Sequence, residues 1–401
     1  MGNVRSTIAL STLTFLFFAM GFITVLNDIL IPHLKQLFEL TYFQAALVQF
    51  CFFGAYFITG SLWGKVISKI GYPNGVISGF VLTAIGCILF WPAASSASYP
   101  VFLGALFILA SGVVLLQTAG NPFVTLLSPG KEARNLTLIQ AFNSLGTTLG
   151  PIFGSVLIIA GASEVLTKTQ EAESVQIPYA IIAGVLILLT IVVKLIKLPD
   201  VRETAEEISA LNDDGKTSAW QYKHLVLGAG AIFAYVGAEV SIGSFLINTM
   251  EQVANISHTQ GAKYIAFYWG GAMVGRFIGT AILIKTPAQK LLAINAIIAC
   301  ILIGIAIIIG KGYGSVIALI AIGLFNSIMF PSIFSLATHG LGKFTSQASG
   351  IICMAIVGGA IIPPIQGAVI DVLGNILISY IIPVICYLYI IYFAQKGYKA
   401  K

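Results

Sequence analysis

The chain has 401 residues, of which 58% are hydrophobic and only 9% are charged, and its mean hydropathy is +0.96. This composition excludes a soluble domain, because too few polar residues are present to cover the surface of one. The formal net charge of +6 follows from the distribution of cations around membrane spans, so we expect no nucleic-acid partner.

Twelve apolar runs follow one another along the chain, and a helix needs about 20 such residues to cross a bilayer. Helices and closed barrels are the spanning structures that satisfy their backbone in lipid, and barrel strands would alternate over about ten residues. The sequence therefore predicts an all-α polytopic membrane protein with 12 transmembrane helices in two six-helix halves. The predicted spans are 8–32, 44–64, 74–94, 99–127, 135–160, 176–197, 224–250, 260–284, 289–310, 314–339, 346–370 and 375–395.

The cations are distributed unequally between the two sides of the predicted membrane. If both termini are cytoplasmic, sixteen lysines and arginines lie inside and four lie outside, as the positive-inside rule requires. We interpret residues 60–72 as the loop between the second and third spans, where Lys65 and Lys69 act as topology determinants. The first run is too long for a cleavable signal peptide. We expect a multi-pass protein of the cell inner membrane with both termini cytoplasmic.

Asp28 stands near the end of the otherwise uncharged apolar run from Thr7 to Pro32. An ionisable residue within a span costs roughly 2.5–3.5 kcal/mol on insertion scales, and it usually faces a water-filled cavity or a partner. We predict that Asp28 belongs to a cation-coupling site, with Asn27 beside it in a structural or pairing role. A carboxylate that reaches outward to the membrane rim is the alternative.

Amide side chains recur at helical spacing on the fourth and fifth spans. Gln117 and Asn121 are four residues apart, and Gln140 and Asn143 are three apart, so each pair shares one helix face. Such polar stripes are unusual in lipid and predict a polar site. Hydrogen bonding between helices, worth about 0.6 kcal/mol per bond in membrane bundles, is the alternative.

A segment of mixed charge from Lys197 to Lys223 divides the chain. We expect six-helix bundles at residues 1–197 and 224–401, joined by a cytoplasmic linker at 198–223. Its EEISAL stretch is a candidate for a short surface helix, although a solvated linker is the simpler interpretation. In both halves, a helix with a proline leads through a basic loop into a glycine-rich helix with a later proline. Parallel repeats of this kind are typical of transporters that bind substrate between their halves.

In the second half, a carboxylate and a guanidinium fall within spans. At 1.5 Å of rise per residue, Glu239 lies roughly 24 Å from the cytoplasmic Lys223, and Arg276 lies roughly 13 Å from Lys285. Because these depths differ, an ion pair between them requires the full reach of the arginine. We predict a second cation-coupling role for Glu239 and a structural, pairing role for Arg276.

Several long strings resemble one known family. They are LNDILIPHL, LQTAGNPFVTLL and RNLTLIQAFNSLGTTLGPIFG in the first half, and GGAMVGRFIG, FNSIMFPSIFSLA and GGAIIPPIQG in the second. They resemble the fucose:proton symporter family of the major facilitator superfamily, and look most like its bacterial glucose/galactose transporter branch. The resemblance covers essentially the whole chain outside the linker. It implies the major facilitator fold and cation-coupled monosaccharide uptake by alternating access.

The resemblance also bears on the coupling ion. In fucose-transporting members, an Asp in an NDILLP-like motif and a Glu in an LETAANPF-like motif are tied to proton coupling and substrate response. The first matches Asp28, but the second falls on Gln117, which cannot take up a proton. Sodium, which needs only hard oxygen ligands, is therefore favoured as the coupling cation, and a proton is the alternative. We expect no other cofactor, and no metal ligand set follows from the sequence.

A hexose offers many hydroxyl groups and an apolar ring face, so its site needs amides and aromatic surfaces. Core or interface packing is the alternative for the aromatic residues. The predicted substrate-binding residues are Gln140, Asn143, Asn121, Gln117, Tyr268, Trp269, Asn326 and Gln366.

Other classes of protein lack support in the sequence. A membrane enzyme needs a nucleophile with a base, or a metal motif such as HExxH, and a nucleotide-driven pump needs GxxxxGK[ST]; neither motif is present. A channel would favour a short selectivity loop, which is not visible. The five cysteines lie in apolar runs without CxxC spacing. We expect a transporter rather than an enzyme, working as a monomer on a monosaccharide in membrane lipid.

Overall fold

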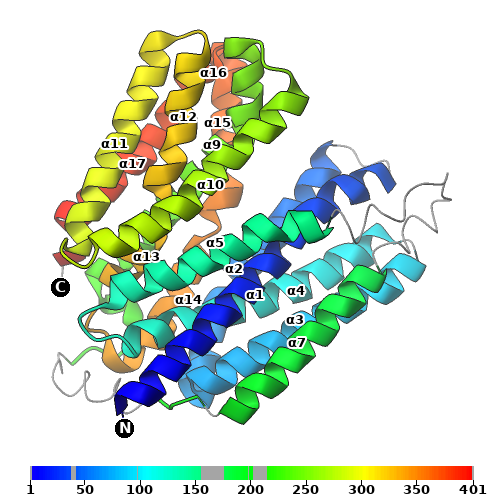
Figure 1. Cartoon of the computed structure of the whole chain (residues 1–401), viewed down its shortest axis with the longest axis vertical. Coiled ribbons are helices and arrows are strands. Elements are labelled where there is room, and N and C mark those ends of the chain that lie inside the picture. Colours follow the sequence, from blue (N-terminus) through cyan, green and yellow to red (C-terminus); the bar gives the residue numbers. More distant parts are fainter. Residues whose placement is uncertain are drawn as a thin grey trace. The chain divides into compact units, whose positions relative to one another are not determined.

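The structure is a computed structural model. It describes residues 2–37, 42–96, 98–154, 176–196, 198–201 and 215–399, with the side chains described from Thr7 to Thr24, from Leu47 to Gly150 except at Ala97, and throughout the later ranges. Every regular element in the described residues is a helix (Figure 1). All twelve predicted spans contain helix, although residues 155–160 of the fifth lie outside the described residues. Eleven described stretches are long and apolar enough to cross a membrane. The EEISAL stretch lies outside the described residues.

The first half contains six described helices. Most extend a few residues beyond the predicted runs, because their polar ends remain helical after the apolar stretch stops. They are α1 (Gly2–Leu37), α2 (Tyr42–Ile70), α3 (Tyr72–Ser95), α4 (Tyr99–Leu126), α5 (Glu132–Gly154) and α7 (Gln176–Ile196).

The second half has more helical segments than spans, because three spans are interrupted. The tenth span breaks at residues 327–328, the eleventh at 356–357 and the twelfth at Tyr380. The segments are α9 (Lys223–Ala254), α10 (His258–Ile282), α11 (Ala288–Ile309), α12 (Tyr313–Asn326), α13 (Met329–Thr338), α14 (Thr345–Ala355), α15 (Gly358–Leu373), α16 (Ile376–Ser379) and α17 (Ile381–Gln395).

The loop predicted at residues 60–72 is wrong. Helix α2 continues to Ile70, and Gly71 alone separates it from α3. Gly71 has φ +82°, a left-handed conformation that glycine adopts without a steric penalty. Its N–H donates to the Ile67 carbonyl at 2.8 Å, so the chain reverses with its backbone satisfied. Lys65 and Lys69 therefore lie on a helix.

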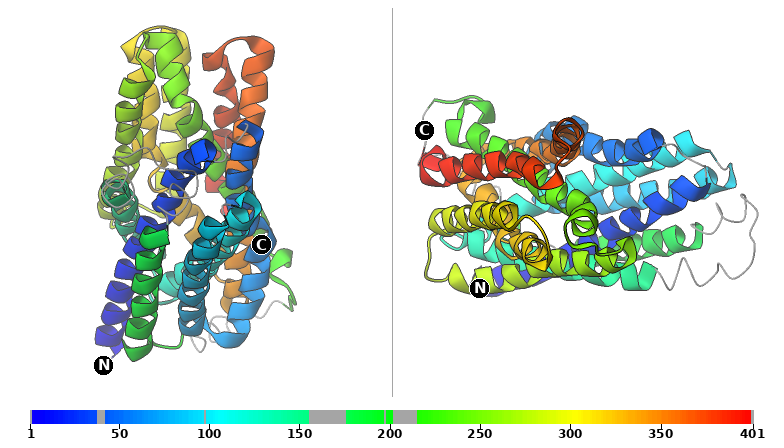
Figure 2. Two further views of the ribbon diagram at one scale, coloured as in Figure 1. Left: turned by 90° about the vertical axis from the view of Figure 1, so that its right-hand side faces the viewer. Right: turned by 90° about the horizontal axis from the view of Figure 1, so that it is seen from above.

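The chain forms two compact units. Unit 1 consists of residues 1–127, 142–211 and 342–354, and unit 2 consists of residues 128–141, 212–341 and 355–401. Within unit 1, α3 packs against both α4 and α7 (Figures 1 and 2). Within unit 2, α9 packs against α15 and α17, while α12 packs against α10 and α11. Helices α4 and α9 each bury many of their residues, and both carry polar residues discussed below.

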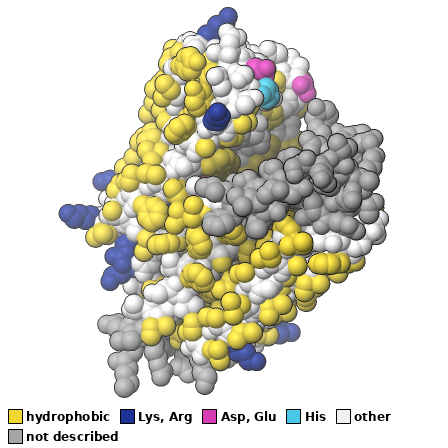
Figure 3. All heavy atoms as spheres, turned by 45° about the vertical axis from the view of Figure 1, so that its right-hand side comes forward, with side chains coloured by type: hydrophobic (Ala, Val, Ile, Leu, Met, Phe, Trp, Pro, Cys, Tyr) yellow, Lys and Arg dark blue, Asp and Glu magenta, His cyan; other side chains and the backbone are white. Residues whose placement is uncertain are grey.

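Large apolar side chains cover much of the described surface. Figure 3 shows them across one face, where lysines and arginines appear only at a few places. Leu195, Ile308 and Val372 are more than two-thirds exposed. Apolar exposure on this scale marks a surface that is covered in the native setting, and lipid covers it in a spanning helix.

A glycine allows close contact between helices α9 and α15. A Cβ atom at Gly358 would collide with the Phe233 carbonyl oxygen, so the two backbones lie closer than any residue with a side chain allows. Small residues permit this approach in membrane bundles, where close packing drives helix association.

We therefore predict that Gly358→Ala destabilises the protein by about 1–3 kcal/mol, the usual cost of overpacking a core. Thermal unfolding in detergent should show a lower Tm. Gly304→Ala in α11 is the matched control, because a Cβ there meets nothing within 4 Å. Equal melting of the two variants would contradict this account of the α9–α15 contact.

Candidate functional site

Glu239, in the middle of α9, is the centre of a polar network in unit 2. The Tyr235 hydroxyl donates to Oε1 of Glu239 at 2.8 Å, and the Tyr268 hydroxyl donates to the Glu239 carbonyl oxygen at 3.1 Å. Nδ2 of Asn326 donates to the Tyr268 hydroxyl at 2.9 Å, and the Tyr387 hydroxyl donates to Oδ1 of Asn326 at 2.7 Å. These bonds tie α9, α10, α12 and α17 together.

Arg276 on α10 hydrogen-bonds to the backbone at the point where the tenth span is interrupted. Its Nε donates to the Ser327 carbonyl oxygen at 3.1 Å, and a terminal nitrogen lies 3.5 Å from the Gln140 carbonyl oxygen, at the outer limit for a hydrogen bond. Among the described residues, no ion pair within 4.0 Å joins Arg276 to Glu239. The guanidinium therefore sits at the carboxyl end of α12, where a cation interacts favourably with the helix dipole.

Trp269 follows Tyr268 in α10 and packs against α9. Its ring meets that of Tyr268 edge to face, with centroids 5.0 Å apart and an interplanar angle of 76°. A Cβ at Gly243 would lie 2.8 Å from Cζ2 of Trp269, so the indole rests directly on the glycine. Its side chain is 43% exposed, whereas Tyr268 is fully buried.

Gln366 lies in a second, fully buried network of unit 2. Its Oε1 accepts a hydrogen bond from the Ser241 hydroxyl, and its Nε2 donates to Oγ of Ser379 at 3.0 Å. Both ends of the amide are thus engaged by protein, connecting α9, α15 and α16. The arrangement satisfies a polar group that would otherwise be costly to bury.

In unit 1, the predicted amides lie on the faces of α4 and α5. Nε2 of Gln117 donates to the Tyr56 hydroxyl at 3.0 Å, and Nδ2 of Asn143 donates to the Phe17 carbonyl oxygen at 2.8 Å. Gln117 and Asn143 are half-buried, while Asn121 is fully buried. Each bond between helices uses one of the two N–H donors of its amide.

Helices α1 and α5 are in close contact, and each contributes a glycine to that contact. A Cβ at Gly21 would collide with the Asn143 carbonyl oxygen, and a Cβ at Gly146 would collide with the Phe18 carbonyl oxygen. Together with the bond from Asn143 to Phe17, these contacts hold the two backbones against one another.

The remaining predicted residues are placed as follows. Gln140 is buried on α5, three residues before Asn143 in the chain, and belongs to unit 2. Asn27 and Asp28 lie within α1, but their side chains lie outside the described residues. The structure thus gathers Glu239, Tyr268 and Asn326 into one network and places Gln366 in another.

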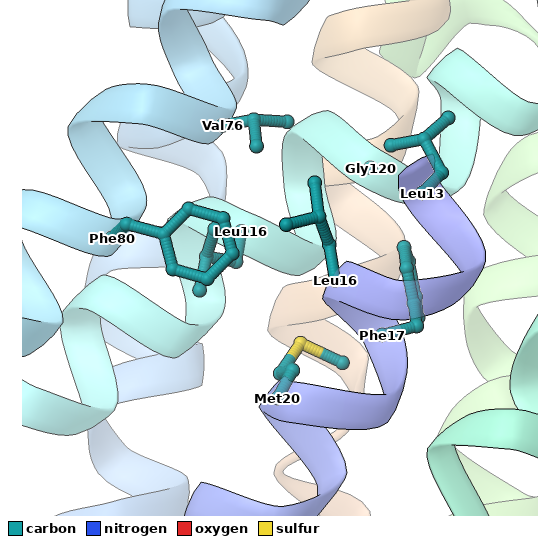
Figure 4. A pocket seen from close by; sticks show the side chains of 8 residues that line it. All are labelled: Leu13, Leu16, Phe17, Met20, Val76, Phe80, Leu116 and Gly120. Carbon is teal, nitrogen blue, oxygen red and sulfur yellow. The ribbon is translucent and has the colours of Figure 1, made fainter. Parts of the chain in front are cut away.

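A small apolar cavity lies between α1, α3 and α4 in unit 1 (Figure 4). Phe17, Phe80 and Leu116 contribute to its wall, and all its lining residues are apolar or glycine. The volume inside it that the centre of a water molecule can reach is only about 10 Å³. With neither room nor polar partners, it cannot hold a polar ligand.

Sequence reasoning missed three participants. Tyr387 lies in the apolar run of the twelfth span, Tyr56 lies in that of the second, and Gly243 lies one turn after Glu239. Nothing in the sequence distinguishes these tyrosines from others in apolar runs. Gly243 is a usable signal only in the general sense that small residues in membrane helices allow close contact with a neighbouring helix.

The described residues suit binding of a neutral polar ligand. They bring amides, hydroxyls, one carboxylate and an exposed indole into helical bundles, and they contain no group of three His, Cys, Asp or Glu side chains that could hold a metal ion. A bundle of spanning helices with polar groups in its interior is the architecture of a membrane transporter.

Comparison with known proteins agrees with this class. The family model of the Major Facilitator Superfamily matches residues 13–364, so the chain belongs to that superfamily. A glucose/galactose transporter of Brucella abortus is 54% identical over 98% of this chain and 94% of its own length. The L-fucose-proton symporter of Escherichia coli is 36% identical over 98% and 94%. A crystal structure of the superfamily transporter FucP in the outward conformation matches with a TM-score of 0.88, at 35% identity over 98% and 99%.

We predict that Arg276→Gln lowers stability by about 1–3 kcal/mol, because the Ser327 carbonyl then loses its partner within the membrane. Arg276→Lys should be intermediate, since it keeps the charge but not the planar donor group. Both are measured as the Tm in detergent. Lys285→Gln, at an exposed position just beyond α10, is the control, and wild-type melting of Arg276→Gln would refute the role at the break.

Proposed function

We propose that this protein carries a hexose of the glucose/galactose kind into the cell together with a cation. The observation that carries the proposal is the 54% identity to a named glucose/galactose transporter over nearly the whole chain. The chemistry is compatible, because amides that both donate and accept suit a ligand with many hydroxyl groups. Gln117, Gln140 and Asn143 are the residues of the first half that we assign to sugar binding, with Asn121 behind them.

The proposed mechanism is alternating access. The six-helix halves, residues 1–197 and 224–401, joined by the linker at 198–223, expose one binding site to each side of the membrane in turn, as related repeat transporters do. Supporting this is the superfamily match. The positive-inside bias and the bacterial relatives favour the inner membrane with both termini cytoplasmic.

We propose sodium as the coupling cation, with Asp28 as its principal ligand. Gln117 stands where fucose-transporting members carry a glutamate, and an amide cannot titrate. Sodium requires only hard oxygen ligands and no change of protonation. A second candidate, proton-coupled transport of fucose or another monosaccharide, is favoured by the 36% identity to an L-fucose-proton symporter.

Uptake by proteoliposomes distinguishes these candidates. Labelled glucose is offered to vesicles with an inward sodium gradient at fixed pH, and separately with an inward proton gradient in the absence of sodium. We expect accumulation under the sodium gradient and its loss with a sodium ionophore. Accumulation under the proton gradient alone would overturn the sodium assignment. Accumulation of fucose but not glucose would overturn the hexose assignment.

Asp28→Asn tests the coupling residue. We expect gradient-driven accumulation to fall to the level of empty vesicles, while exchange of labelled for unlabelled sugar continues, because exchange does not require an ion-free carrier to return. The control is Asp371→Asn, which removes a carboxylate from the carboxyl-terminal turns of α15 and should transport normally. Concentrative uptake by Asp28→Asn at the wild-type rate would remove Asp28 from the mechanism.

A further inference from the structure

The indole of Trp269, from α10, contacts α9 at Gly243, one turn beyond Glu239. Glu239 and Gly243 are four residues apart on α9 and so lie one above the other on the same helix face. The Trp269 ring rests on Gly243, where a Cβ would approach Cζ2 to 2.8 Å. The indole is therefore placed about one helical turn, roughly 5–6 Å, from the glutamate position.

Glu239 keeps acceptor capacity after its contacts with protein are counted. An ionised carboxylate offers about four acceptor positions, and the Tyr235 hydroxyl occupies one of them at Oε1. Glu239 is partly buried, with some exposure remaining. Ligand hydroxyl groups can therefore donate to it, and Tyr235 fixes its direction.

The residues beside Glu239 and Trp269 are engaged with one another. Tyr268, Asn326 and Tyr387 are each fully buried, and their hydrogen bonds run from α17 through α12 to the α9 backbone at Glu239. Tyr268 thereby fixes the rotation of α10 relative to α9, and with it the direction of the adjacent Trp269. Buried, mutually satisfied groups of this kind orient a site instead of contacting its ligand.

We propose that Glu239 and Trp269 form a carbohydrate subsite in unit 2, and that Tyr387, through Asn326 and Tyr268, positions it. A hexose presents an apolar face of C–H groups, which stacks on an indole, and an edge of hydroxyl groups, which donate to a carboxylate. This inference rests on the proposed hexose transport and deepens it. It assigns Glu239 to sugar recognition in place of ion coupling.

The subsite has a consequence for specificity. A site that accepts a particular sugar hydroxyl discriminates strongly against the analogue that lacks it, because the acceptor then loses its partner. Wild-type protein should bind at least one monodeoxyglucose at least tenfold more weakly than glucose. In Glu239→Gln this ratio should collapse, because an amide oxygen accepts more weakly than a carboxylate.

The test measures equilibrium binding of labelled glucose and its monodeoxy analogues to purified wild-type protein and variants, with Tm as the check of folding. We expect Glu239→Gln and Trp269→Ala to weaken glucose binding at least tenfold, and Tyr387→Phe to weaken it about threefold to tenfold. Tyr389→Phe is the matched control on the same helix, because it loses a hydroxyl that donates to the Leu227 carbonyl at 3.2 Å; it should bind normally.

Measurements on Tyr387→Phe can distinguish a positioning role from a purely structural one. Tyr387→Phe should lower the preference for glucose over the deoxy analogue and should have little further effect in a Glu239→Gln background, since coupled residues are not additive. Equal weakening of all sugars, additive with Glu239→Gln, would make Tyr387 merely structural and overturn its assignment. If Tyr387→Phe does not fold, Gly243→Ala takes its place, because the added Cβ displaces the indole from the α9 side. This variant should reduce glucose binding in a protein that still folds.

The outcomes separate this inference from the proposed function. Failure of wild-type protein to bind any hexose would overturn the proposed function itself. Hexose binding by wild type that Glu239→Gln and Trp269→Ala retain in full would overturn the subsite alone. Unchanged glucose affinity in Glu239→Gln, together with loss of ion-stimulated uptake, would return Glu239 to ion coupling.

Discussion

Polar groups at membrane depth are costly without partners in the protein, and the break in the tenth span shows how such partners are supplied. Ending α12 at Asn326 and restarting at Met329 leaves backbone groups without helical partners. Arg276 binds the Ser327 carbonyl, and the Asn326 side chain is held between two tyrosines. Because these partners come from α10 and α17, satisfying one interruption fixes the arrangement of four helices in unit 2.

The same constraint explains why most predicted site residues also serve the fold. Gln117 and Asn143 each donate to a neighbouring helix, and Gln366 is engaged at both ends of its amide. The sequence leaves interhelical bonding and ligand binding as alternatives for these amides. For the half-buried Gln117 and Asn143 they are compatible, because a bond to one N–H orients the amide and leaves the rest of its hydrogen-bonding capacity intact.

The helices could be predicted from sequence because the length and apolarity of each run are local properties. The partners at the breaks could not: Pro331 lacks the N–H that the Ser327 carbonyl would accept in a continuous helix, but the arginine that compensates lies about fifty residues earlier. Tyr387 was missed for the same reason, since its role depends on which helices meet. Gly71 ends α2 later than expected, because basic residues after Gly64 mark the membrane boundary without ending the helix. Glu239 and Arg276 were both found as intramembrane charges, but their partners were not.

The contact between α1 and α5 has a mechanical consequence. Helix α1 is continuous from Gly2 to Leu37, and glycines at positions 21 and 146 let it lie directly against the α5 backbone. Position 28 is seven residues, or almost two full turns, beyond Gly21, so it falls on the same side of the rod. If Asn143 contacts the sugar as proposed, a tilt of α5 toward that ligand would press directly on the α1 backbone and would displace position 28 with it.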